Sequence, residues 1–171
     1  MKFLKLIPIL FIFFGNVPIK NAVHAEIKNP KDLRVLSSES KKLSILNVKY
    51  YLKQGDKSIG NGDFDKAKEF YLDARELAKQ MARFYSDLNN VFSGVDARIP
   101  NEMQRKGKET LQILAGSNER LASLYIKNDQ PEVAVPLLIE NIRILSPNSP
   151  EGKEAYNKLI KLGFVETKYR G

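Results

Sequence analysis

Residues 62–74 read GDFDKAKEFYLDA, a turn followed by the beginning of a helix. Gly62 completes a Gly-Asn-Gly break, and Asp63 is a residue type that commonly caps a helix N-terminus. Beyond it, small and apolar residues recur in steps of three and four, which is the spacing of one helix face. These positions are Ala67, Phe70, Ala74, Leu77, Met81, Phe84, Leu88 and Val91. The pattern predicts a helix over residues 63–93, roughly 46 Å long and well above the usual length.

Helical spacing also precedes this segment and resumes after it. The positions before the turn are Val48, Tyr51, Leu52, Gly55 and Ile59. Residues 93–100 interrupt the pattern, and Asn101 is suited to cap a third helix that extends to Tyr125. The sequence thus predicts a short helix before the Gly-Asn-Gly break and a second long helix after residue 100.

Prolines define the C-terminal part of the pattern. Pro131 and Pro150 each suit the first turn of a helix and mark the fourth and fifth helices. Pro136 lies past the first turn of the fourth helix, where it removes one hydrogen bond and is expected to bend the axis. No alternating strand pattern is present. The sequence therefore predicts an all-α fold over residues 43–163, with antiparallel helix pairs and about five helices, two of them long and central.

The N-terminal 25 residues have the three parts of a secretory signal. Lys2 and Lys5 precede an apolar run over residues 6–14, and a polar stretch ends in a small residue, Ala25. A membrane anchor is the alternative, but nine apolar residues span only about 13 Å as a helix, against ~30 Å of bilayer core. We therefore predict a signal peptide over 1–25, a polar and partly ordered lead over 26–42, and export to a periplasm, an internal lumen or the extracellular space, with no stable membrane span after processing.

Composition excludes several classes of chemistry. The chain has 171 residues, no Cys, no Trp and a single His, His24, inside the predicted signal. The processed chain would lack thiol nucleophiles, His-based triads and Cys or His metal ligands. We expect no cofactor, no metal and no catalytic residue. Carboxylate-based glycan cleavage is the less favoured exception, because the glutamates considered for it fall mostly on polar helix faces. They are Glu69, Glu76, Glu119, Glu132 and Glu140.

Residues 51–78, which include the quoted stretch and part of the helix before it, resemble a tetratricopeptide repeat (TPR). The family has a Gly-Asp-aromatic turn, with small and aromatic residues at fixed positions of two helices. The matching positions here are Tyr51, Gly55, Gly62, Ala67, Tyr71 and Ala74. A second copy is similar over residues 121–147, through Leu121, Tyr125 and Ala134. The chain departs from the family at Gln54, where Leu is usual, at Asp129-Gln130-Pro131 in place of the turn motif, and over residues 81–115, which contain no repeat.

The resemblance implies stacked helix pairs, each covered by the next, and a non-enzymatic module that binds a protein or peptide partner. We expect a groove between the first helix pair and the middle helices. Its predicted contact residues lie on the exposed side of the first helix and are Lys49, Tyr50, Leu52 and Lys53.

A basic surface is the alternative binding site. Arg98, Arg105, Lys106 and Lys108 form it, and membrane headgroups, an acidic polymer or an acidic protein would be its partner. An internal pair between Asp96 and Arg98, or a helix-end cap, is the simpler interpretation of the 96–100 loop. Nucleic acid is not expected as a partner, because no recognition motif is present.

Two further features leave alternatives open. Asn118 interrupts the apolar face of the third helix, where it would either bind a peptide backbone or, as we prefer, be satisfied inside the core or fix the helix register. In the tail, residues 164–171, Phe164 would fold back onto the helices, or Tyr169 and Arg170 would face a partner.

Overall fold

The computed structural model describes residues 43–170 of the chain. In this part the protein is all-α and contains no strand. The helices are α2 (Ile45–Gly60), α3 (Phe64–Phe92), α4 (Arg98–Lys127), α5 (Pro131–Leu145) and α6 (Pro150–Lys161). The predicted fold class and the two long helices, α3 and α4, are confirmed. The predicted signal peptide and the lead over 26–42 lie outside the described residues.

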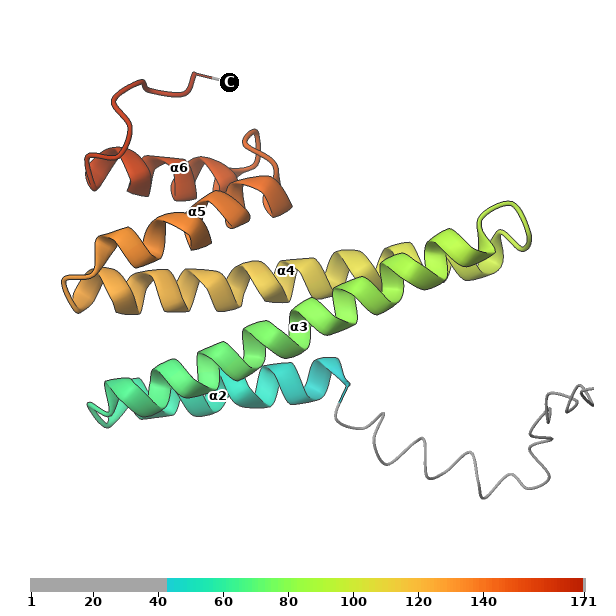
Figure 1. Ribbon diagram of the computed structural model, residues 1–171, viewed down its shortest axis with the longest axis horizontal. Coiled ribbons are helices and arrows are strands. Elements are labelled where there is room, and N and C mark those ends of the chain that lie inside the picture. Colours follow the sequence, from blue (N-terminus) through green and yellow to red (C-terminus); the bar gives the residue numbers. More distant parts are fainter. Residues whose placement is uncertain (1–42, 171) are drawn as a thin grey trace, which may run out of the picture.

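The helices form an antiparallel array in which each packs on the next in sequence, and α2 also touches α4 (Figure 1). The long helices α3 and α4 lie side by side at the centre. The shorter α2 covers one end of α3, and α5 and α6 stack beyond α4 (Figure 1). The far halves of α3 and α4, with the 93–97 loop, therefore extend past the other helices as a hairpin. We call this part, residues 82–112, the arm.

Side-chain caps begin three of the helices, as their sequences favour. Ser44, Asp63 and Ser149 accept hydrogen bonds from backbone N–H groups in the first turns of α2, α3 and α6.

The predicted cap of the third helix, Asn101, is wrong, because α4 begins at Arg98. The Asp96 carboxylate accepts the Arg98 N–H at 3.0 Å and so binds one of the unpaired donors of the first turn. Pro100 falls within that first turn, where its missing N–H leaves no intrahelical hydrogen bond unmade.

Two apolar clusters hold the array together. One joins α3, α4, α5 and α6 around the fully buried Leu121 and Leu138. The other joins α2, α3 and α4 around Val48, Met81 and Leu114. Most of the TPR-like positions are buried in or beside these clusters, namely Gly55, Ala67, Tyr71, Ala74, Leu121 and Ala134. The remaining positions differ, since Tyr51 and Tyr125 are half-buried and Gly62 lies in an exposed turn with φ +77°.

Close packing of α2 on α3 depends on Gly55. A Cβ at this position would lie closer than 3.0 Å to the Tyr71 ring. The ring has no room to move, because Tyr71 is buried and its hydroxyl donates to Asp56 at 2.7 Å. Arg120 of α4 also binds Asp56, at 2.8 Å through its Nε. The absence of a side chain at Gly55 thus allows α2, α3 and α4 to meet at Asp56.

Replacing Gly55 with Ala should therefore destabilise the protein. Overpacking costs ~1–3 kcal/mol, while the better helix propensity of Ala returns up to ~1 kcal/mol. We expect the free energy of unfolding in urea to fall by about 1–2 kcal/mol. Gly116→Ala is the matched control, since a Cβ there meets only Arg120 at an ordinary 3.6 Å. If both variants were equally stable, the Gly55–Tyr71 contact would not limit the packing.

Candidate functional site

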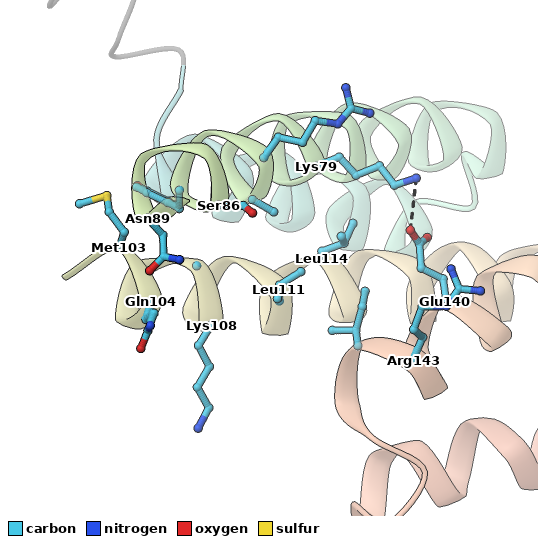
Figure 2. A pocket seen from close by; sticks show the side chains of 15 residues that line it. Lys79, Ser86, Asn89, Met103, Gln104, Lys108, Leu111, Leu114, Glu140 and Arg143 are labelled. Atoms are coloured by element: carbon cyan, nitrogen blue, oxygen red, sulfur yellow. Dashed lines mark ion pairs between the residues drawn. The ribbon is translucent and has the colours of Figure 1, made fainter. Parts of the chain in front are cut away.

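A groove with a volume of about 640 Å³ lies between the arm and the C-terminal end of α5 (Figure 2). Its lining residues run from Lys79 to Asn89 on α3 and from Met103 to Leu114 on α4. From α5 come Glu140, Arg143 and Ile144. The apolar part consists of Ala82, Tyr85, Met103, Leu111, Leu114 and Ile144. We call this hollow the arm groove.

The arm itself is poorly covered. The last buried residue of α3 is Met81, although the predicted apolar face continues to Val91. Phe84 is 53% exposed, Val91 68% and, in the loop, Val95 77%. The cause is helix length, because α2 has 16 residues and α5 has 15, whereas α3 and α4 have 29 and 30. About 20 Å of each long helix thus lacks an outer partner among the described residues.

A polar network closes the inner end of the arm groove. Glu140 accepts hydrogen bonds from Arg75 at 2.7 Å and from Asn118 at 3.0 Å. Lys79 forms an ion pair with the same carboxylate at 3.2 Å (Figure 2). Arg75 also donates its Nε–H to Asn118 at 2.6 Å. Asn118 is fully buried, so its predicted role inside the core is confirmed, and the network joins α3, α4 and α5.

The network holds Glu140 in its charged form. Burial alone would raise the pKa of this carboxyl, but the hydrogen bond and charge of Arg75, with Lys79 and Asn118, lower the pKa below its ordinary 4.5. A carboxyl with a lowered folded-state pKa adds stability above its unfolded-state pKa. That stability is lost as the pH falls through the folded-state value.

The free energy of unfolding should therefore decrease as the pH falls below about 4.5, through the lowered pKa of Glu140. Glu140→Gln should be less stable at neutral pH and show a shallower decrease over this range. Chemical unfolding followed at several pH values measures both curves. Parallel curves for the two proteins would mean that Glu140 does not contribute to the acid sensitivity.

Cations surround the rest of the arm groove. Arg83, Lys108 and Arg143 line it, and none forms an ion pair with another residue in the part of the chain that the structure describes. In Figure 2, Lys108 extends from α4 away from α3, while Arg143 lies beside Glu140 at the end of α5. The lining thus holds four cations against one carboxylate, a surplus of three positive charges.

The first predicted contact surface, on α2, does not form one face. Lys49, Tyr50 and Lys53 are exposed, and Lys49 pairs with Glu109 at 3.8 Å. The predicted exposure of Leu52 is wrong, because its side chain packs against both apolar clusters. Leu52 follows Val48 by one helical turn and so shares the buried face of α2. None of the four lines the arm groove.

The alternative basic surface is divided by the structure. Arg98 binds Asp96 through Nε at 3.0 Å and Nη2 at 2.6 Å, which is the predicted internal pair. Lys106 pairs with Glu102 at 2.7 Å. Arg105 is exposed, and Lys108 alone of the four reaches the arm groove.

A second hollow, of about 420 Å³, contains the carboxylates Glu119, Glu151 and Glu154 between α4 and α6. Lys158 pairs with Glu119 and, at 3.2 Å, with Glu154. Two carboxylates joined by a shared lysine are typical of a structural ion pair that links helices. Among residues 43–170, no cluster of three or more His, Cys, Asp or Glu residues is suited to a metal ion.

The C-terminal tail folds back on α6. The Tyr156 hydroxyl donates to the Thr167 carbonyl at 2.7 Å, and the rings of Tyr156 and Tyr169 meet edge to face. Tyr169 also binds Asn148, and Val165 packs on the first apolar cluster. Phe164 stays 47% exposed. The tail thus covers α6 through Val165 and Tyr169, not through Phe164.

Comparisons identify no relative. No family model, no curated protein and no solved structure matches the chain. Within residues 43–170, no helix is long and apolar enough to cross a membrane. The TPR-like pattern therefore stays a prediction, carried by the positions quoted above.

Proposed function

We propose that this protein is a non-enzymatic interaction module of TPR-like type, exported as its N-terminal segment predicts, which binds a protein partner through the arm groove. The observation that carries the proposal is the arm. Two helices of about 30 residues project beyond their neighbours and keep apolar side chains exposed next to a groove of about 640 Å³. Exposed apolar surface beside a polar rim is typical of a protein-binding site.

The helix lengths support this assignment. Neighbouring helices of equal length would make the fold more stable, because each apolar side chain left uncovered loses roughly 1.5–3 kcal/mol of stabilisation from burial. Phe84 and Val91 remain exposed on the arm, and Leu111 is 37% exposed within the groove. A partner that covers these side chains would gain the burial that the fold leaves unused.

A basic surface module is less well supported. Of its four predicted residues, Arg98 and Lys106 are each paired with a neighbouring acid. Because the neighbouring carboxylate neutralises each of these cations, the pairs attract another anion only weakly. Lys108 contributes to the arm groove instead.

Affinity purification tests the proposed function. The full chain, with a C-terminal tag, is expressed in its native organism beside Leu111→Glu in the arm groove and Tyr50→Glu on α2. We expect one defined protein with the unmodified chain and with Tyr50→Glu, and its loss with Leu111→Glu. Circular dichroism verifies that each variant folds. Loss with Tyr50→Glu alone would move the site to α2, and no defined partner with any chain would contradict the proposal.

A further inference from the structure

The length of the arm groove matches that of a short α-helix. Its lining residues span 79–89 on α3 and 103–114 on α4, or about 15 Å along each helix. That length corresponds to three helical turns, or about 11 residues of a helix. A helix laid in a groove anchors itself by apolar residues at i, i+3 or i+4, and i+7.

The array also lacks a helix at this place. Ile144 near the end of α5 and Leu114 near the middle of α4 both line the inner end of the groove. Beyond them, residues 98–112 of α4 have no helix on the α5 side in the described part of the chain. A helix from a partner would extend the layer that α5 begins, and would cover Leu111 and Met103.

The charges that line the arm groove indicate the charge of its occupant. Glu140 is the only carboxylate in the lining, and Arg75, Lys79 and Asn118 already occupy it. A neighbouring hollow is lined by the same Glu140 and Arg143, and also by Arg75 and the exposed Ile139. Arg83 and Lys108 remain without a carboxylate from the described residues. Acidic side chains on the occupant would supply the missing counter-charges.

Three other occupants fit less well. Residues 26–42, the segment that remains after the predicted processing, carry five Lys and Arg residues against three acids, so the chain's own N-terminal segment would also be repelled. A second copy carries the same net charge of +8. A membrane surface is flat, whereas these cations surround a hollow formed by three helices.

We infer that the arm groove receives an acidic amphipathic helix of another protein, with its apolar side chains on Leu111, Leu114 and Ile144 and its carboxylates on Arg83, Lys108 and Arg143. This inference rests on the proposed function and names the chemistry of its partner. The apolar contacts supply affinity, and the cations select against neutral or basic helices.

A displayed library of helical peptides tests the inference. Its members carry apolar residues at i, i+4 and i+7 and random residues at the flanking positions. The full chain is the target, beside the charge-reversed variant Arg83→Glu/Lys108→Glu. The matched control is Lys53→Glu/Arg105→Glu, which changes the net charge equally at two exposed positions outside the groove.

We expect the selected peptides to be rich in Asp and Glu. Fluorescence anisotropy should show at least tenfold weaker binding to the groove variant and less than a twofold change with the control. Binding should weaken at about 0.5 M salt, where exposed charges are screened, without being abolished.

Selection of neutral or basic peptides that still require Leu111 would overturn the acidic occupant while leaving the proposed function intact. Equal losses with both double variants would also overturn it, in favour of general attraction to a basic surface. The acidic occupant would also be overturned if the chain formed a dimer, or bound phosphatidylglycerol vesicles, and only the groove variant lost that interaction. An absence of any selected peptide would contradict the inference, and failure of the affinity purification above would separately contradict the proposed function.

Discussion

Asn118→Ala is expected to lower the free energy of unfolding by about 3 kcal/mol. Asn118 is fully buried in α4 and binds two charged groups, accepting from Arg75 at 2.6 Å and donating to Glu140 at 3.0 Å. Hydrogen bonds to charged groups contribute ~1.5–3 kcal/mol each. Water partly compensates here, because the Arg75 and Glu140 side chains are both 23% exposed. The two hydrogen bonds together therefore contribute less to the free energy of unfolding than two fully buried ones would.

Urea unfolding of matched variants measures this effect. Asn101→Ala is the control, since Asn101 is exposed in the first turn of the same helix and the two substitutions change helix propensity alike. We expect the control to stay within about 0.5 kcal/mol of the native protein. Similar values for the two variants would show that the three-helix network adds no stability. The arm groove would then lack the rigid inner end that we assign to it.

Local signals explain how far the fold could be predicted from the sequence. The Gly-Asn-Gly break, Asp63 and the two helix-starting prolines lie at the ends of elements, where a few residues decide the backbone. The long periodic face of α3 likewise required no tertiary information. The prediction of Asn101 as a helix cap was wrong because the Asp96 carboxylate, five residues earlier, binds the first free N–H of α4 instead.

The arm groove could not be predicted in the same way. Lys79 and Arg83 lie one turn apart on the polar face of α3, a pattern that usually means a solvated surface. Arg143 is 60 residues further along and joins them only because α5 ends beside the middle of α4. The exposure of Phe84 and Val91 has the same cause. Their spacing predicts a buried face, but whether that face is covered depends on the length of α2.

Gly152→Ala should destabilise the junction between α5 and α6 by about 3 kcal/mol, the upper end of overpacking costs. Gly152 is buried in the first turn of α6, and a Cβ there would lie closer than 3.0 Å to the Ser146 carbonyl. That carbonyl cannot move freely, because Ser149 binds it through its backbone N–H at 3.2 Å and its hydroxyl at 3.0 Å. Ser146 itself has φ +73°, a region that favours glycine, so the turn is already constrained.

The clash can be relieved only by moving this turn away from α6, which would break the Ser149 cap of Gly152 at 2.9 Å. Ala155 and Leu159 would then lose part of their packing on α5. Glu151→Ala is the control, because it changes the neighbouring exposed residue and should cost only a few tenths of a kcal/mol. Urea unfolding gives the stabilities, and hydrogen exchange shows where the loss occurs. We expect faster exchange of α6 amides in Gly152→Ala with the arm unchanged, and equal exchange in the two variants would contradict a role for this close approach.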